Sequence, residues 1–302
     1  MGLNLSGMTT ETRNPRTMQL DQMSPLEIVT VMNEEDARVP LAIAKCLPQI
    51  AQAVTWAAEA FEKGGRLFYM GAGTSGRLGV LDAAECPPTF GVPKEMVVGL
   101  IAGGEKAFIE AVEGAEDSRE LAVEDLKTHG LTADDFVAGI AASGRTPYVL
   151  GGLDYAKSVG CHTAAIACNI GSAIGKAAEL AIEVNCGPEV LTGSTRLKSG
   201  TAQKLILNMI STGSMVRTGK AYQNLMVDVQ QTNEKLHTRA ENIVIDATGV
   251  EREKARAAID AAGGSVKTAI TMLLADCDAA EAARRLEKAR GHVREAIRLE
   301  VL

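Results

Sequence analysis

The sequence predicts an α/β protein with a doubly wound, five-stranded parallel sheet and a small helical C-terminal domain. Short runs that are apolar throughout alternate with glycine-rich turns and helical stretches, as strands buried on both faces of a parallel sheet do. Right-handed crossovers between such strands place helices on both faces. After Asp246 the strand-like runs end, and Ala, Glu, Arg and Lys dominate.

The N-terminal part is expected to be an irregular arm, because it is rich in Thr, Asn, Arg and Pro. Ser24 and Pro25 then mark a helix start, a capping residue followed by proline at the first helical position. A longer helix is expected over Val39–Glu62, where apolar residues recur at helical spacing. Lys63-Gly64-Gly65 is a typical end for it.

Five strands and the helices between them are predicted next. The strands are expected over Arg66–Met70, Met96–Ala102, Phe136–Ala142, His162–Cys168 and Leu180–Asn185. The helices are expected over Ser75–Ala84, Ala107–Val112, Ser118–His129, Pro147–Val159, Ser172–Ala178 and Ser199–Thr218. Glycines at 249, 263, 264 and 291 divide the remainder into three or four short helices. We therefore expect two domains, residues 1–247 and 248–302.

Composition argues against several classes of protein. The net charge of −7 disfavours broad nucleic-acid binding, and an aromatic content of 3% disfavours stacking platforms for bases or sugars. No apolar run is long enough to span a membrane, and the N-terminus lacks a signal-peptide pattern. The six cysteines form no Cys-x-x-Cys pair and the four histidines show no metal-ligand spacing. We expect reduced thiols, a cytoplasmic location and no metal.

The loop after the first strand is Gly71-Ala72-Gly73-Thr74-Ser75-Gly76, at the sheet edge where such folds bind ligands. It matches the G-x-G-x-x-G pattern of dinucleotide sites, but no acidic residue stands at the end of the second strand to hold a ribose. Thr74 and Ser75 instead place two hydroxyls at a helix N-terminus. With the backbone N–H groups there, including that of Gly73, they favour a phosphate monoester.

A second hydroxyl-bearing loop, Ser143-Gly144-Arg145-Thr146-Pro147, follows the third strand. Thr146 and Pro147 read as a helix start, so Thr146 is either a cap or a ligand group. Ser143 and Thr146 could both donate to sugar or phosphate oxygens. Two such loops on one sheet edge favour a sugar phosphate over a dinucleotide.

Two carboxylates are candidates for proton transfer. Glu85 is expected at the end of a helix that Pro87 stops, where the helix dipole raises the basicity of a carboxylate. The alternative is a solvated glutamate. Glu116 lies in an acidic cluster in which Asp117 or Ser118 is expected to cap the next helix. The Glu116 carboxylate therefore has no expected role as a helix cap.

The loop before the last long helix combines the carboxylate of Glu189, the hydroxyls of Ser194 and Thr195 and the cation Lys198. It follows the fifth strand and so belongs to the same sheet edge. The alternative is a polar loop that caps the helix through Ser199.

Together these motifs resemble the signature of the N-acetylmuramic acid 6-phosphate etherases, a family of the sugar isomerase (SIS) superfamily. The likeness is strongest over Gly71–Gly79 and Glu85–Gly91. It continues through Thr10–Pro15, Glu113–Asp117, Ser143–Pro147, Thr192–Arg196, Asn233–Leu236 and Arg239-Ala240. One departure is Ala84, where the family pattern has a serine.

The resemblance implies a SIS fold with a ubiquitin-associated-like helical bundle at the C-terminus. It also implies a cytoplasmic, homodimeric carbon–oxygen lyase of cell-wall sugar recycling that needs no cofactor or metal. Its small-molecule substrate is a sugar phosphate. Its reaction cleaves the lactyl ether by elimination and hydration, giving N-acetylglucosamine 6-phosphate and D-lactate.

The residues can be assigned on this basis. Glu85 protonates the leaving oxygen and Glu116 is its acid/base partner. The remaining substrate and phosphate contacts are expected from Gly73, Thr74, Ser75, Ser143, Gly144, Thr146, Glu189, Ser194 and Thr195, with Lys198 as a further candidate. His237 is either a ring-opening or partner-subunit contributor or an ordinary packed or solvated histidine.

Three alternatives remain at this point. A sugar-phosphate-sensing regulator, like the glucokinase regulatory protein, needs the hydroxyl loops but not two carboxylates. An aldose–ketose isomerase of the same fold would also use a carboxylate base. A nicotinamide dehydrogenase is the third.

Overall fold

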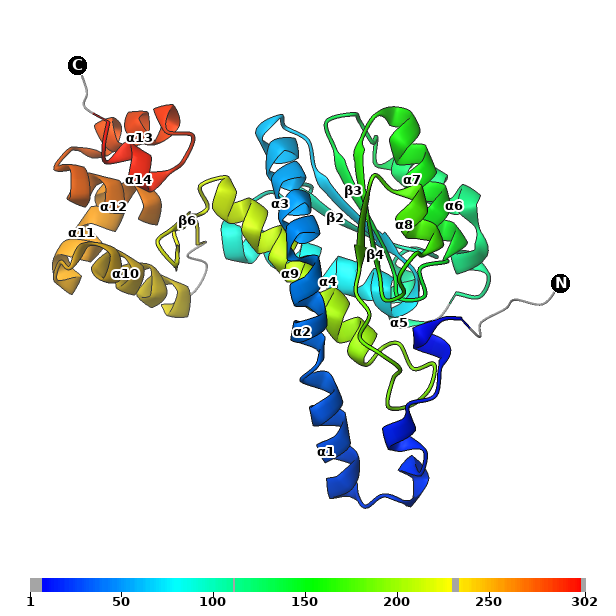
Figure 1. The fold of residues 1–302 in the computed structure, drawn as a ribbon. Helices are drawn as coiled ribbons and strands as arrows, with labels where there is room; N and C mark the ends of the chain where they lie inside the picture. Colours follow the sequence, from blue (N-terminus) through cyan, green and yellow to red (C-terminus); the bar gives the residue numbers. More distant parts are fainter. Residues whose placement is uncertain (1–6, 111, 230–233, 300–302) are drawn as a thin grey trace. The chain divides into compact units, whose positions relative to one another are not determined.

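The computed structural model describes residues 7–110, 112–229 and 234–299 (Figure 1). The chain forms two compact units. The first contains the residues up to Ala84 together with Glu95–Ser211, and the second contains Glu85–Lys94 and the chain from Thr212 onward. The second unit therefore takes in more of the chain than the expected domain of residues 248–302.

The first unit is built on the predicted parallel sheet. Its strands are β1 (Leu67–Gly71), β2 (Val97–Ile101), β3 (Phe136–Ala141), β4 (His162–Ala167) and β5 (Leu180–Glu183). All neighbours pair in parallel, in the order β2-β1-β3-β4-β5. The chain thus moves from β1 to one side and then returns to continue on the other. The predicted fold class is confirmed, and β1 and β3 flank the point where the strand order reverses.

Helices cover both faces of the sheet (Figure 1). One face carries α6 (Arg119–Thr128), α7 (Pro147–Val159) and α8 (Ala173–Ala177). The other carries α3 (Leu47–Glu62) and the first parts of α4 (Gly73–Phe90) and α9 (Lys198–Arg217). Alternation along β1 explains the two layers, because Met70 faces α7 while the Tyr69 hydroxyl donates to the Leu207 carbonyl of α9, at 3.3 Å.

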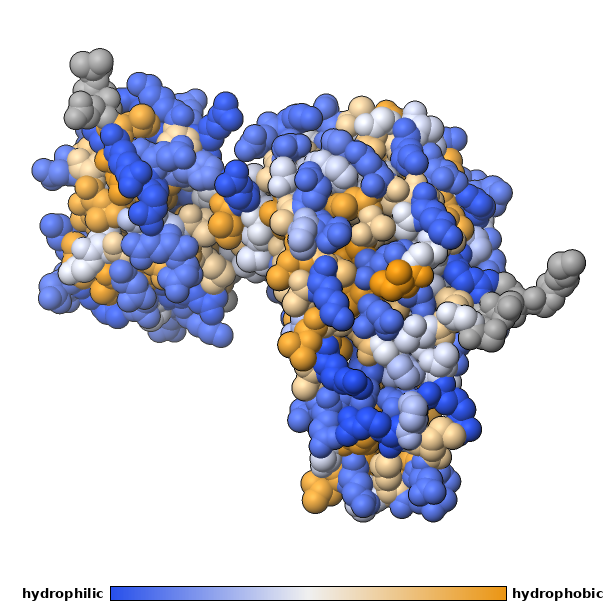
Figure 2. All heavy atoms as spheres, in the orientation of Figure 1, coloured by the Kyte–Doolittle hydropathy of each residue, from blue (hydrophilic) through white to orange (hydrophobic). Residues whose placement is uncertain are grey.

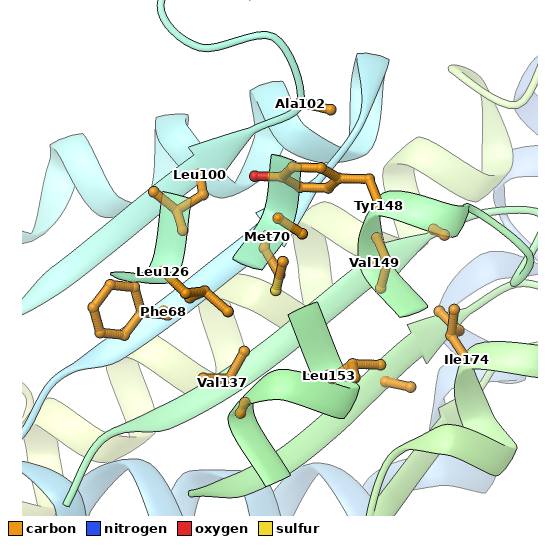
Figure 3. Close-up of a cluster of buried hydrophobic side chains, with 14 of the residues drawn as sticks. Phe68, Met70, Leu100, Ala102, Leu126, Val137, Tyr148, Val149, Leu153 and Ile174 are labelled. Atoms are coloured by element: carbon orange, nitrogen blue, oxygen red, sulfur yellow. The ribbon is translucent and has the colours of Figure 1, made fainter. Parts of the chain in front are cut away.

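The core under α6 and α7 is apolar. Figure 3 shows Phe68 and Met70 of β1 in one cluster with Leu100, Val137 and side chains of α6 and α7. Short connections complete this part of the unit: α5 (Lys106–Ile109) and the 3₁₀ turn η5 (Ala115–Asp117). Burial of these large apolar side chains, at about 1.5–3 kcal/mol each, fixes which face of every strand points inward.

The N-terminal arm is more ordered than expected. It contains three 3₁₀ turns, η1 (Thr9–Glu11), η2 (Pro15–Thr17) and η3 (Leu20–Gln22). Helix α1 (Pro25–Asp36) begins at Ser24 as predicted, with a capping box between Ser24 and Glu27. The long helix expected over 39–62 is divided into α2 (Val39–Ile43), η4 (Ala44–Cys46) and α3. Pro48 explains the division, because it cannot donate to the preceding turn.

The expectation that Pro87 ends its helix is wrong, since α4 continues through Pro87 and Pro88 to Phe90. A proline inside a helix costs about 3 kcal/mol. Burial of Cys86 and Phe90 in this turn offsets part of that cost. Gly91, at φ +62°, then ends the helix. Glu85 therefore lies inside α4 and not at its C-terminal end.

The second unit joins helices to a short hairpin. It contains β6 (Ala221–Tyr222), β7 (Leu225–Met226), α10 (Glu234–Thr248), α11 (Arg252–Ala261), α12 (Val266–Ala275), α13 (Ala279–Lys288) and α14 (Val293–Ala296). Val227 and Val229 share a buried core with the helices, and Lys267 of α12 binds the Asp228 carboxylate at 2.6 Å. A Cβ on Gly91 would lie 2.4 Å from the Asp228 carbonyl oxygen. These contacts explain why 85–94 and 212–229 belong with the helical bundle.

The ubiquitin-associated-like character of the bundle stays a prediction. Within the part of the chain that the structure describes, no helix is long and apolar enough to cross a membrane.

Candidate functional site

The loop between β1 and α4 is held close to the sheet by glycine. A Cβ on Gly71 would lie 2.8 Å from the carbonyl oxygen of Ile140 on β3. Gly73 starts α4 at φ +53°, a conformation that favours glycine. The first N–H groups of an α-helix have no acceptor within the helix. Thr74 is half-buried and Ser75 is buried beside them, so this loop presents donors to an anion.

Helix α9 runs parallel to α4 along the same face. The Ser75 hydroxyl donates to Oε1 of Gln203 at 3.0 Å, and further along both helices Asp82 accepts from Asn208 at 2.6 Å. Residue numbers rise together along both helices, so their N-termini lie at one end. A Cβ on Gly200 would lie 3.6 Å from Cγ2 of Thr74, which places the start of α9 beside the first loop.

The loop after β3 is tied to its neighbours by a buried amide. Nδ2 of Asn169, which follows β4, donates to the carbonyls of Ala142 and Ser143, both at 3.3 Å, and to Oγ1 of Thr10 at 3.1 Å. Gly144 adopts φ +74°, and a Cβ there would lie 2.3 Å from Cβ of Ser172. This close packing fixes the backbone on which Ser143 stands.

The predicted helix start is confirmed, with Thr146 at the N-cap position of α7, but the Thr146 side chain makes no capping hydrogen bond. Thr146 is nevertheless only 9% exposed. The Ser143 hydroxyl accepts from the backbone N–H of Arg145 at 3.3 Å and is half-buried. Both hydroxyls follow β3, whose neighbour β1 leads to Thr74 and Ser75. The structure thus places the two predicted hydroxyl loops on adjacent strands at the reversal of strand order, where open α/β sheets bind ligands.

Glu189 and Lys198 have other partners than a ligand. The Glu189 carboxylate is buried and accepts from the backbone N–H groups of Lys198 and Ser199, at 3.0 and 2.9 Å, and from the Ser199 hydroxyl. It therefore caps α9. Nζ of Lys198 is buried 2.6 Å from Oε2 of Glu35. These contacts already occupy both side chains, and a substrate contact from either of them stays a prediction.

Ser194 and Thr195 lie in the turn that precedes this capped helix start, and both are half-buried. The turn is closed by backbone bonds from Ser194 to Leu191 and from Leu197 to Ser194, at 3.0 and 3.1 Å. Through Gly200, the turn adjoins the loop of Thr74. It can therefore contribute to the same edge as the first loop.

Burial and ion pairing act in opposite directions on Glu35. Burial by itself raises the pKa of this carboxyl group. Hydrogen bonds from Lys198 and Arg16 outweigh it and lower the pKa of Glu35 to about 2. Asn14 also donates to the same carboxylate, at 3.1 Å. A charged Glu35 therefore connects the N-terminal arm, α1 and the start of α9.

The two candidate acid/base residues lie in different units. Glu116 is exposed on η5 in the first unit, and η5 packs against α7. Ser118, and not Asp117, caps the helix that follows, with its hydroxyl accepting from Leu121 N–H at 3.1 Å. Glu85 is exposed on α4 in the second unit. The structure brings the hydroxyl loops of the first unit together, and the pairing of these glutamates stays a prediction.

His237 lies on the exposed side of α10 in the second unit. It lines a cavity of about 530 Å³ with Glu241, Arg256 and Asp260. Of the family-like segment Asn233–Leu236, Asn233 lies outside the described residues. The role of His237 stays a prediction as well.

Sequence reasoning missed Gln203, whose side chain is 1% exposed against Ser75. One signal was available: Leu207 and Ile210, one and two turns further on, are apolar, so Gln203 is a polar residue on an apolar helix face. It also missed Asn169, because nothing local marks a single asparagine after β4 as the link between two loops.

Comparison with known proteins gives two kinds of match to the fold. Residues 49–157 match the family model of the glucokinase regulatory protein N-terminal SIS domain. A solved structure of a candidate phosphosugar isomerase involved in capsule formation from Bacteroides fragilis is similar at a TM-score of 0.51 and 19% identity. That alignment covers 67% of this chain and 95% of the other, and it supports the fold alone.

Curated relatives match over nearly the whole chain. The N-acetylmuramic acid 6-phosphate etherase of an Exiguobacterium species is 62% identical, over 97% of this chain and all of its own length. The enzyme of the same name from Serratia proteamaculans is 61% identical, over 98% of this chain and 99% of its own. At such identity and coverage, with the sheet and both hydroxyl loops in place, the chain belongs to the N-acetylmuramic acid 6-phosphate etherase family.

Proposed function

We propose that this chain is a carbon–oxygen lyase that cleaves the D-lactyl ether of N-acetylmuramic acid 6-phosphate. The products are N-acetylglucosamine 6-phosphate and D-lactate. The observation that carries the proposal is the pair of hydroxyl loops on β1 and β3, at the reversal of strand order, in a chain of this family. The reaction belongs to the recycling of cell-wall amino sugars.

The 6-phosphate is bound by the first-unit loops. The N–H groups that begin α4, with Thr74 and Ser75, hold its oxygens, and Ser143 and Thr146 complete the contacts from β3. The glycines at 73 and 144 let the backbone approach the ligand. Ser194 and Thr195 border the sugar, while Glu189 and Lys198 hold the turn in place.

The chemistry is an elimination followed by a hydration. In the open-chain sugar, the C2 proton lies next to the C1 aldehyde and is acidified. A carboxylate removes that proton, the bond from C3 to the lactyl oxygen breaks, and Glu85 protonates the departing oxygen. Water then adds to the C2–C3 double bond, with its hydroxyl at C3 and a proton returned to C2. Glu116 is the acid/base partner of Glu85 in these transfers.

We further propose a cytoplasmic homodimer. Exposed leucines and a valine on α1, α2 and α3 support a contact between copies, and Figure 2 shows hydrophobic residues among the polar ones along these helices. The residues are Leu26, Val29, Leu41 and Leu47. His237 is a candidate for ring opening or for a contribution to the partner's site.

The test is the release of D-lactate and N-acetylglucosamine 6-phosphate from the phosphorylated substrate. Unphosphorylated N-acetylmuramic acid is the matched control, and it should react far more slowly because the hydroxyl loops then have no phosphate to hold. Binding of the substrate without lactate release would favour the regulator. Aldose–ketose conversion with the ether intact would favour the isomerase, and either result would overturn the proposal.

A further inference from the structure

We propose that Gln203 sets the direction of the Ser75 hydroxyl hydrogen, so that Ser75 can donate to a phosphate oxygen at the α4 N-terminus. Gln203 is then a positioning residue that acts through Ser75. The inference rests on the proposed phosphate site and adds to it a residue that orients one of its donors.

The contact is buried and incomplete. Gln203 is 1% exposed and Ser75 is 6% exposed, with 3.0 Å between the serine Oγ and the glutamine Oε1. Among the described residues, Nε2 of Gln203 has no hydrogen-bond partner. A buried amide nitrogen without an acceptor loses its hydration without compensation, which is uncommon in folded proteins.

The direction of this hydrogen bond matters for the ligand. A serine hydroxyl has one hydrogen and two lone pairs. With Oε1 of Gln203 beside it, the Ser75 hydroxyl donates its hydrogen to the glutamine and offers only lone pairs to the ligand. A phosphate dianion also offers only lone pairs, so this arrangement does not suit it.

Rotation of the Gln203 amide by half a turn solves both problems. The oxygen and nitrogen of an amide have nearly the same size and exchange places without a backbone shift. Nε2 then donates to Oγ of Ser75, which frees the serine hydrogen for a phosphate oxygen. Oε1 then occupies the buried position that Nε2 has left. An unpaired carbonyl oxygen is tolerated better there than an unpaired N–H group.

The charge around the two parallel helix starts supports this assignment. The start of α9 is occupied by the protein's own carboxylate, Glu189, which accepts from the backbone of Lys198 and Ser199. The start of α4 faces the neutral amide of Gln203 through Ser75. Of the two neighbouring N-termini, one is therefore neutralised internally, and the other keeps its positive potential for an external anion.

The decisive variant is Gln203→Glu. An ionised glutamate can only accept, so it holds the Ser75 hydrogen inward and adds a negative charge near the phosphate. We expect KM for the substrate, and Ki for inorganic phosphate as a competitive inhibitor, to rise about tenfold or more at pH 8. As the pH falls and the new carboxyl group protonates, it can donate to Ser75, so the ratio of variant to wild-type Ki should move back towards one.

Two comparisons separate this role from packing. Gln203→Met keeps the shape without either polar group, and it should raise Ki only a few fold, with no added pH dependence. Gln52→Glu introduces the same charge at an exposed position of α3 and should leave Ki unchanged. Wild-type Ki for Gln203→Glu at every pH, or equal and pH-independent losses in both Gln203 variants, would overturn the inference.

The phosphate measurement also keeps the two proposals apart. Direct binding of inorganic phosphate by calorimetry does not require turnover. One outcome is that the wild type binds phosphate, Gln203→Glu weakens this binding as predicted, and the wild type releases no lactate. The proposed reaction then fails and this inference stands. If lactate is released and Gln203→Glu binds phosphate normally, this inference fails alone.

Discussion

Lys198 and Glu35, 163 positions apart in the chain, form a buried ion pair with 2.6 Å between Nζ and Oε2. The pair connects the first residue of α9 to α1, and Asn14 and Arg16 of the arm bind the same carboxylate. The turn with Ser194 and Thr195 ends at this lysine. The ion pair therefore holds the turn that we propose as one border of the substrate site.

Removal of the lysine charge should destabilise the protein strongly. Lys198→Met keeps most of the side-chain volume but leaves the buried carboxylate with fewer donors, and breaking such a pair costs about 3–5 kcal/mol. The free energy of unfolding in urea measures the loss. Arg119→Met, which breaks an exposed pair with Asp154, should cost less than about 1 kcal/mol. Equal losses in the two variants would contradict the assigned importance of burial.

Stability should also fall in mild acid through Glu35. The pKa of Glu35 is about 2 in the folded protein, against an ordinary value of 4.5. The unfolded chain therefore takes up the proton first, so this contribution is complete above pH 4.5 and is lost as the pH falls towards 2. The urea midpoint should decline more steeply between pH 5 and pH 3 in the wild type than in Glu35→Gln. Identical slopes would show that Glu35 carries no such linkage.

Gly144 should be intolerant of a side chain. Alanine there must adopt φ +74°, which costs about 1–3 kcal/mol, and its Cβ would lie 2.3 Å from Cβ of Ser172. We expect Gly144→Ala to lose stability and to raise KM by shifting Ser143. Gly130→Ala is the matched control, because Gly130 has φ +61° but no atom within 4 Å of the added Cβ. A similar KM in both variants would show that the loop of Ser143 and Gly144 does not contact the substrate.

The two glutamates should be needed for chemistry and not for folding. Glu85→Gln and Glu116→Gln should each lower kcat by about 10²–10⁴-fold, the usual contribution of a general acid or base. Both side chains are exposed, so unfolding midpoints should hardly move. Glu113→Gln, an exposed neighbour of Glu116, should retain activity. Turnover near that of the wild type in Glu85→Gln would remove it from the mechanism.

The elimination route predicts an exchange at one carbon. Because the C2 proton is removed and a solvent proton is later returned, N-acetylglucosamine 6-phosphate formed in deuterium oxide should carry deuterium at C2. Proton NMR of the isolated product measures it. Full retention of the original hydrogen would indicate direct displacement of the ether.

Local patterns predicted what depends on neighbours in the chain. The apolar runs predicted the five strands, because continuous burial in a parallel sheet leaves that signature in a few residues. Ser24 and Pro25 predicted the start of α1, because capping is a contact between residues three apart. The same local reasoning failed at Pro87, where burial of Cys86 and Phe90 carries α4 past two prolines. Nor could local sequence connect Glu189 to the start of α9, or Lys198 to Glu35.

The sequence by itself determined the class of fold, the two hydroxyl loops and the pair of candidate glutamates. These follow from residue periodicity, turn chemistry and motifs that are read over short stretches. Only the tertiary structure decided that β1 and β3 are neighbours, so that the loops of Thr74 and Ser143 follow adjacent strands of the sheet. It also decided that Gln203 faces Ser75, 128 positions earlier in the chain. Such pairings depend on strand order and helix packing, which arise from burying all the apolar faces at once and leave no mark on the residues themselves.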